Sequence, residues 1–264
     1  MNAPIVILGA GYTGKFLTTT LSTAARSYLC TSRNPAHNLL HVPEDHRLHF
    51  DLAQPSTWQN IPPGTDVLWC FPAAPLDLVQ RFAREAQLSS RRIVVLGSTS
   101  AYVVASNSED YPPPWIDETA RIDLTKPRVQ GEEFLREQGA IVLRVAGIYG
   151  PGRNPLDWIR SGRVVPSRKY VNLIHVEDLA TICLSAIEKG QRGGTYNVSD
   201  GMPRTWEDIS RKIPDATIPA ASQSTDEAGK RILTAKLKTH LGFTPRYPDL
   251  FAALDYLDDR ARLP

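Results

Sequence analysis

The N-terminal stretch Pro4-Ile5-Val6-Ile7-Leu8-Gly9-Ala10-Gly11-Tyr12-Thr13-Gly14 carries the strongest signal in this chain. An apolar run of strand length meets three glycines at G-x-G-x-x-G spacing, and an apolar-periodic segment follows. A strand turns into a helix in this way beneath a dinucleotide pyrophosphate. Gly9 is expected to make the tight turn, Gly11 to leave room for the phosphates, and Gly14 to let the helix pack on the strand. The first N–H groups of that helix would face the anion. An ordinary turn without a ligand is the alternative.

Composition and charge exclude several classes of protein. The chain has 264 residues, of which 42% are hydrophobic and 22% charged, and its formal net charge is +2. These values are typical of a soluble globular protein with one large α/β domain or a main domain with a small lobe. There is no dense basic tract and no apolar run near the ~20 residues that span a bilayer, so neither nucleic acid nor a membrane is expected as a partner. Because the sequence starts with a strand, we expect no signal peptide.

The cysteines indicate a cytoplasmic protein. Cys30, Cys70 and Cys183 stand apart in apolar or strand-like segments and are interpreted as reduced core residues. The histidines are scattered, and no metal-ligand spacing is present, so no metal site is predicted.

Over residues 1–150, apolar runs alternate with helical patterns. The expected strands are residues 4–8, 27–31, 47–50, 66–71, 92–96 and 140–145, and the expected helices lie near residues 14–25, 76–86 and 129–138. Such an alternation predicts an α/β fold with a doubly wound parallel sheet, a Rossmann domain, covered on both faces.

Residues 151–264 are predicted to form a small C-terminal substrate lobe, with some elements returning to the core. The expected elements are helices at Val176–Lys189, 205–212 and 250–258 and a strand at 194–198. Thr205 is a plausible N-cap for the second of these helices, with Asp208 at position N3. The lobe would cover the carboxyl edge of the sheet, where open α/β sheets bind ligands.

The end of the second strand favours NADP over NAD. An NAD site usually has Asp or Glu there, to bind the ribose 2′-hydroxyl. This chain instead has Thr31-Ser32-Arg33, and two hydroxyls beside a guanidinium suit a 2′-phosphate. The alternative is a solvated arginine that opens a loop.

Two further strand ends complete the expected cofactor site. Asp51 can accept from the adenine amino group while Leu52 lies against the ring, or Asp51 can be a helix N-cap before Pro55. Phe71-Pro72 ends the fourth strand, where the small residues that follow would let the cofactor backbone pass. The candidate cofactor-binding residues are Gly9, Gly11, Tyr12, Thr13, Gly14, Ser32, Arg33, Asp51, Leu52, Phe71 and Pro72.

Five later segments form, together with the glycine loop, an ordered series of motifs. They are Ile93-Val94-Val95-Leu96-Gly97-Ser98-Thr99-Ser100-Ala101-Tyr102, Leu143-Arg144-Val145-Ala146-Gly147-Ile148-Tyr149-Gly150-Pro151-Gly152-Arg153, Asn172-Leu173-Ile174-His175-Val176-Glu177-Asp178-Leu179-Ala180, Tyr196-Asn197-Val198-Ser199-Asp200, and Lys230-Arg231-Ile232 followed by Leu241-Gly242-Phe243. In this order and over nearly the whole chain, they resemble the extended short-chain dehydrogenase/reductases. The resemblance is closest to the short, atypical NAD-dependent epimerase/dehydratase-like branch.

The resemblance implies a Rossmann domain, a nicotinamide cofactor and a substrate lobe. It places Ser98 or Thr99 where the family keeps the hydroxyl that binds the reacting substrate oxygen. In the family, the segment matching His175-Val176-Glu177-Asp178 mostly fixes the lobe to the core. Family members often pair through helices equivalent to residues 76–86 and 129–138, which agrees with a homodimer.

The chain departs from the family at the Tyr-x-x-x-Lys pair. Counting back from Glu132 puts Leu124 at the tyrosine position and Arg128 at the lysine position. Leucine cannot transfer a proton, and arginine can bind ribose but stays charged. Tyr102 is a candidate replacement that would face the nicotinamide, and its alternative is packing beside the strand end. Tyr149, at the end of the sixth strand, is another candidate, and its alternative is an aromatic residue at the rim of the site.

Two further segments near the expected site carry ionisable groups. Lys126 can point into the crevice or stay a solvated loop lysine. Asp117-Glu118 resembles a family segment that closes over the site and usually anchors a loop. The candidate catalytic residues are Ser98, Thr99, Tyr102 and Arg128.

Three functions follow from these features. The first is an NADP-dependent oxidoreductase that reduces a carbonyl, an imine or an enone of a cytosolic small molecule. The second is a non-catalytic NADP-binding regulator or scaffold. The third is a sugar-nucleotide epimerase or dehydratase, which the small lobe and the missing tyrosine disfavour.

Overall fold

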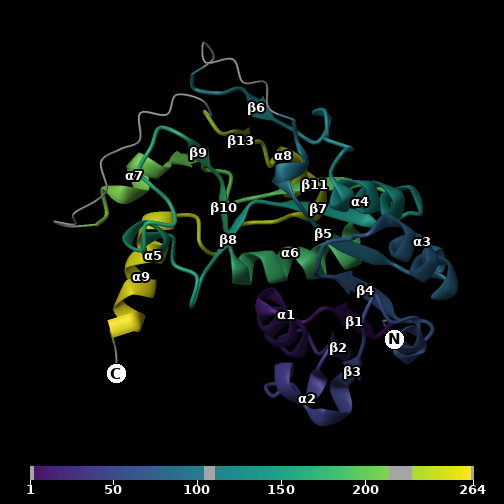
Figure 1. The fold of residues 1–264 in the computed structure, drawn as a ribbon. Helices are drawn as coiled ribbons and strands as arrows, with labels where there is room; N and C mark the ends of the chain where they lie inside the picture. The colour runs from purple at the N-terminus through teal and green to yellow at the C-terminus, as the bar shows by residue number, and fades with distance from the viewer. Residues whose placement is uncertain (1–2, 104–110, 214–227, 263–264) are drawn as a thin grey trace.

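A parallel sheet forms the centre of the molecule. The structure, a computed structural model, describes residues 3–103, 111–213 and 228–262. Within these ranges, the main sheet has seven strands in the order β11-β7-β5-β4-β1-β2-β3, and all neighbours are parallel (Figure 1). They are β1 (Ile5–Leu8), β2 (Tyr28–Ser32), β3 (Arg47–His49), β4 (Asp66–Trp69), β5 (Ile93–Ser98), β7 (Ile141–Val145) and β11 (Thr195–Val198). The strand order reverses at β1 and β4, so a ligand crevice is expected at their carboxyl ends.

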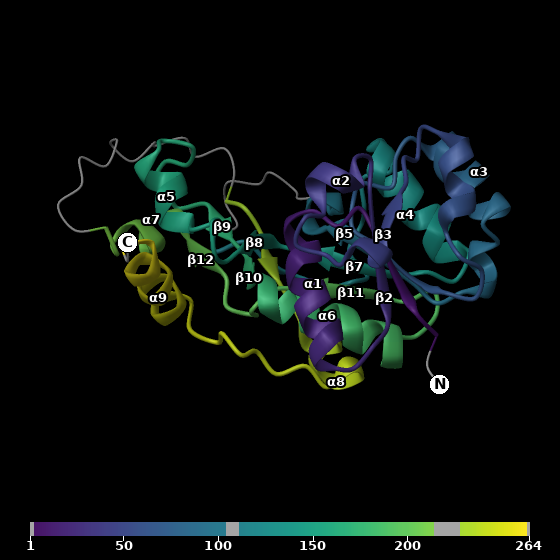
Figure 2. The same cartoon turned by 90° about the horizontal axis from the view of Figure 1, so that it is seen from below.

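Helices cover both faces of this sheet, as Figures 1 and 2 show. On one face lie α1 (Tyr12–Thr23), α6 (Val176–Lys189) and α8 (Ala235–Leu241); on the other lie α3 (Leu76–Glu85) and α4 (Pro127–Glu137). Alternate residues of β1 enter the two cores: Ile5 and Ile7 pack with α1 and α6, while Val6 and Leu8 pack with α3. A strand buried on both faces therefore needs a continuous apolar run.

In the part of the chain that the structure describes, no helix has both the length and the apolar character needed to cross a membrane.

The predicted α/β fold class is confirmed, and the expected strands occur at nearly the expected residues. The first helix begins earlier than expected, at Tyr12, because Gly11 already serves as its N-cap. The expected helix at 205–212 is α7 (Trp206–Ser210), and the predicted capping box of Thr205 and Asp208 is present. The last helix, α9 (Leu250–Arg262), is longer than expected. Short helical elements lie in the connections between the strands: α2 (Pro35–Asn38), η1 (Glu44–His46), η2 (Pro55–Asn60), η3 (Leu88–Ser90) and η4 (Thr99–Ala101).

A lobe lies at one end of the sheet and has its own core (Figure 2). It contains α5 (Pro155–Arg160), α7 and α9, which pack around Tyr149, Leu156 and Ile209. Its strand pairs were not predicted: β8 (Gly147–Tyr149) with β10 (Leu173–His175), β9 (Tyr170–Val171) with β12 (Arg204–Thr205), and β6 (Trp115–Ile116) with β13 (Arg231–Ile232). Of the predicted lobe, residues 214–227 and 263–264 lie outside the described residues.

Candidate functional site

Each glycine of the N-terminal loop has a different environment. Gly9 has φ +76°, and a Cβ there would lie 2.7 Å from Phe71 Cδ1, so a side chain would be strained and crowded. A Cβ at Gly14 would lie 2.9 Å from the Ala10 Cβ. The absence of a side chain at Gly14 therefore lets the helix pack closely on the preceding turn. A Cβ at Gly11 would meet nothing within 4 Å. The loop therefore keeps open space above Gly11, where a phosphate group can approach the backbone.

The N-terminus of α1 adds hydrogen-bond donors to this space. Gly11 is the N-cap, and no side chain caps the helix. The N–H groups of Tyr12, Thr13 and Gly14 belong to the first turn, where no carbonyl of the same helix can accept from them. Such groups together with the helix dipole favour an anion.

A cavity of about 730 Å³ opens beside the loop, at the carboxyl ends of β1 to β4. Of the predicted cofactor-binding residues, Gly9, Gly11, Tyr12, Ser32, Arg33, Asp51, Leu52 and Phe71 line it, whereas Thr13, Gly14 and Pro72 do not. Thr31 and Ala74, which the sequence places at the two strand ends of this site, also line the cavity. The remaining lining residues were not predicted: Ala10, Lys15, Asn38, Phe50, Ala53, Pro75 and Leu78.

The end of this cavity near β2 is basic. Ser32 Oγ accepts hydrogen bonds from the Asn34 backbone N–H at 3.1 Å and from Asn38 Nδ2 at 2.8 Å, which leaves its own hydrogen to donate. Arg33 and Lys15 both line the cavity and are exposed. Lys15 has a sequence signal that was missed: a cation in the first turn of a helix opposes the helix dipole, so it points to an anion outside the helix.

Asp51 is the carboxylate among the lining residues of this cavity. Its Oδ1 accepts from the Ala53 backbone N–H at 2.9 Å. It does not cap the next helical turn, because Gln54 is the N-cap of η2. The alternative interpretation of Asp51 as an N-cap is therefore wrong, and Asp51 lies in the cavity wall.

The candidate catalytic residues lie outside the lining of this cavity. Ser98 ends β5, and its Oγ accepts from the Ser100 backbone N–H at 3.1 Å, which caps η4. The Thr99 carbonyl accepts from Lys230 Nζ at 2.9 Å, and the Ser100 carbonyl accepts from Lys126 Nζ at 2.7 Å. The structure therefore brings two ammonium groups to the turn that follows Ser98. Sequence reasoning weighed Lys126 and missed Lys230.

Tyr102 is held inside the protein. Only 2% of it is exposed, and its hydroxyl donates to Asn197 Oδ1 at 2.6 Å. Burial raises the pKa of this phenol well above its usual range. This geometry favours the packing alternative over a role as proton donor.

Arg128 and Leu124 differ sharply in environment. Leu124 is 56% exposed and precedes α4. Arg128 donates from Nη2 to the Leu96 carbonyl at 3.5 Å and from Nε to Glu132 Oε1 at 3.0 Å, so it lies beside β5. Arg128 thus places a cation near the end of β5, whereas Leu124 offers no ionisable group.

The segment from His175 to Asp178 joins the lobe to the core. Both oxygens of Asp178 accept backbone N–H groups, from Arg246 at 2.9 Å and Tyr247 at 3.1 Å. The His175 ring lies 3.6 Å from the Tyr247 ring, between centroids, and burial lowers the pKa of His175 to about 4. Tyr149 is also buried, with its ring 5.2 Å from that of His175. These contacts are structural, as the resemblance implied for this segment.

No protein-family model matches the chain. Among curated proteins, it is similar to protein YeeZ of Escherichia coli K12, with 28% identity over 113 residues. The match covers 41% of this chain and 41% of YeeZ, so it spans less than half of the relative.

Solved structures share the fold over almost the whole chain. A functionally unknown conserved protein from Silicibacter pomeroyi has 23% identity and a TM-score of 0.75, over 99% of this chain and 100% of that one. A short-chain dehydrogenase/reductase superfamily protein from Agrobacterium tumefaciens, solved with bound NAD, has 16% identity and a TM-score of 0.75, over 98% and 97%. At these identities the likeness establishes a common fold.

Proposed function

We propose that the chain is an NAD(P)-dependent oxidoreductase of the atypical extended short-chain dehydrogenase/reductase type, acting on a cytoplasmic small molecule. The observation that carries this proposal is the cavity at the reversal of strand order, bounded by open space above Gly11 and the uncapped start of α1. That combination fits a dinucleotide pyrophosphate.

The basic end of the cavity supports NADP over NAD. Arg33 and Lys15 supply two cations, and Ser32 supplies a hydroxyl hydrogen. A 2′-phosphate gains charge-assisted hydrogen bonds from such groups that a 2′-hydroxyl does not. Asp51 and Leu52 would hold the adenine.

When bound, NADPH supplies a hydride, and the chain's own residues would bind the substrate beside it. Ser98 would donate its hydroxyl hydrogen to the substrate oxygen, because it ends β5 next to the crevice. Arg128 would hold the nicotinamide ribose. A proton for the product would come from Lys126 or Lys230 at the same turn, or from solvent. A carbonyl, imine or enone suits this arrangement, and an imine that arrives protonated needs no acid from the protein.

A second candidate is a non-catalytic NADP-binding regulator. The exposed Leu124 at the tyrosine position favours it, because the family's proton donor has no substitute at that position. Both candidates are compatible with a homodimer through α3 and α4.

Turnover of NADPH with a panel of aldehydes, ketones, imines and enones separates the two. If the chain is an enzyme, NADPH should be oxidised in the presence of at least one of these substrate classes. Ser98→Ala should then reduce turnover about 10²-fold. Tight NADPH binding without turnover of any class would favour the regulator.

A further inference from the structure

A loop of the lobe reaches back to the glycine loop. The Tyr12 hydroxyl donates to the Pro151 carbonyl at 3.1 Å. The Arg153 guanidinium carbon lies 4.0 Å from the centroid of the Tyr12 ring. A Cβ at Gly150 would lie only 3.0 Å from the Tyr12 hydroxyl. The backbone and the side chain of this loop therefore both lie against a residue that lines the cavity.

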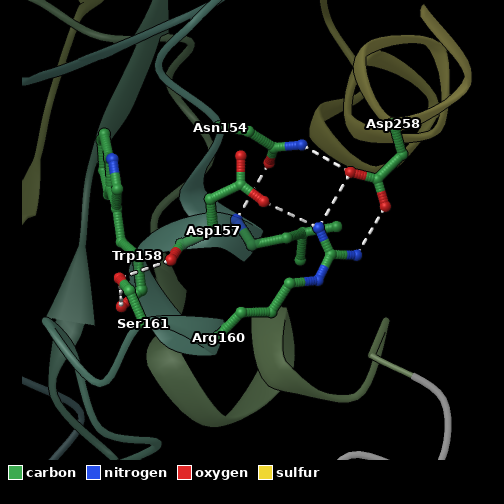
Figure 3. A network of polar contacts seen from close by, with 7 residues as sticks. Asn154, Asp157, Trp158, Arg160, Ser161 and Asp258 are labelled. Carbon is green, nitrogen blue, oxygen red and sulfur yellow. Dashed lines mark hydrogen bonds and ion pairs between the residues drawn. The ribbon is translucent and has the colours of Figure 1, made fainter. Parts of the chain in front are cut away.

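The loop that carries Arg153 is fixed from both sides. Gly150 and Arg153 exchange backbone hydrogen bonds of 3.2 and 2.8 Å. The next residue, Asn154, accepts from the Leu156 N–H at 2.9 Å and donates to Asp258 Oδ1 of α9 at 2.7 Å. Arg160 also binds Asp258, with Nη2–Oδ2 at 2.6 Å, as Figure 3 shows. This network holds the start of α5 against α9, so the backbone of Arg153 has a defined place.

The guanidinium of Arg153 is available to an anion. The residue is exposed, and no described carboxylate or carbonyl accepts a hydrogen bond from its side chain. Stacking on an aromatic face engages the plane of the guanidinium and leaves its N–H groups, which lie in that plane, free to donate.

The charge of a dinucleotide favours a cation in the nicotinamide half of the crevice as well as in the adenosine half. The pyrophosphate carries two negative charges, and the end of α1 offers only about half a positive charge. Arg33 and Lys15 line the part of the cavity formed by β1, β2 and α1, the adenosine half of a doubly wound fold. Arg153 comes from the chain that follows β7 and β8, on the other side of the reversal of strand order.

We propose that Arg153, stacked on Tyr12, binds the nicotinamide-side phosphate of the dinucleotide. This inference rests on the proposed function, because it assumes that the cavity binds NADP. It assigns a binding residue to the lobe, so the lobe contributes to cofactor affinity as well as to substrate binding.

Calorimetric titration with NADP⁺ and with 2′,5′-ADP tests the inference without a substrate. The second ligand keeps the adenosine 5′-phosphate and the 2′-phosphate but lacks the nicotinamide-side phosphate. Arg153→Gln should weaken NADP⁺ binding about tenfold or more, the usual effect of one lost charge-assisted hydrogen bond. Its affinity for 2′,5′-ADP should stay within about twofold of wild type.

Arg168→Gln is the matched control, because Arg168 is also exposed and stacks on a tyrosine, 3.9 Å from the ring of Tyr111. It should leave both affinities unchanged. If wild type binds both ligands and Arg153→Gln changes neither, or weakens both equally, the inference is overturned. If wild type binds neither, the proposed function fails, and the inference falls with it.

Discussion

Arg128 Nε donates to Glu132 Oε1 at 3.0 Å, across one turn of α4. Glu132 is fully buried, and its Oε2 has no hydrogen-bond partner among the described residues. A Cβ at Gly97 would lie 2.6 Å from that oxygen, so a glycine in β5 makes room for the carboxyl group. A buried acid thus holds the Arg128 guanidinium beside β5.

The buried acid should make stability depend on pH. Burial raises the pKa of Glu132 above its ordinary value, although Arg128 opposes the change. Above pH about 4.3, the folded chain then holds a proton that the unfolded chain has lost. The contribution of Glu132 therefore falls as pH rises toward the folded-state pKa. Glu132→Gln cannot titrate, so the free energy of unfolding of wild type minus that of the variant should fall as pH rises.

Urea unfolding over a series of pH values measures this difference. Glu137→Gln, on an exposed site of the same helix, is the control and should give a flat difference. A difference for Glu132→Gln that is flat or rises with pH would show that the buried carboxyl is not destabilised in its charged form.

Alanine should cost stability at one glycine of the N-terminal loop and have almost no effect on stability at another. Gly9→Ala should lower the free energy of unfolding by about 2 kcal/mol or more, because of the positive φ and the contact with the Phe71 ring. Gly11→Ala should change it by less than about 0.5 kcal/mol, because a Cβ there meets open space. Chemical denaturation of both variants measures the contrast, and equal losses would contradict the loop geometry.

Arg33 should set the choice of cofactor. Arg33→Asp should erase or reverse the preference for NADP, a change of about tenfold or more in relative affinity, since it replaces a cation by a group that accepts from a 2′-hydroxyl. Arg163→Asp, at an exposed arginine of the lobe, should leave the preference unchanged. Equal calorimetric affinities of wild type for NADP⁺ and NAD⁺ would remove the basis of the assignment.

Ser98 and Tyr102 should separate catalysis from stability. Ser98→Ala should reduce turnover of a confirmed substrate about 10²-fold, and the lost cap of η4 should lower the free energy of unfolding by only about 1 kcal/mol. Tyr102→Phe should lower the free energy of unfolding by about 1–3 kcal/mol, because Asn197 Oδ1 loses its donor in the interior. Its turnover should stay near wild type; a loss as large as that of Ser98→Ala would restore Tyr102 as the replacement phenol.

The sequence predicted the elements that have a local pattern. β1, the glycine turn and α1 follow one another within a short stretch, and their apolar periodicity and spacing are visible without the fold. The pairing of Trp115–Ile116 with Arg231–Ile232 has no such signal, because a two-residue strand has no period and its partner is far along the chain. The same holds for the contact between Tyr12 and Arg153, which depends on how the lobe folds back. For the candidate site, the sequence showed where Tyr102 stands in the motif. It could not show that the Tyr102 hydroxyl is buried in a hydrogen bond to Asn197.

Calorimetric titration of NADPH into wild type and Gly11→Val tests the central claim most directly. A valine side chain at Gly11 would fill the open space where the pyrophosphate is expected. The account predicts one NADPH site in wild type, tighter than for NADH, and no measurable binding to a folded Gly11→Val variant. Binding retained by the folded variant, or no binding of either dinucleotide to wild type, would contradict it.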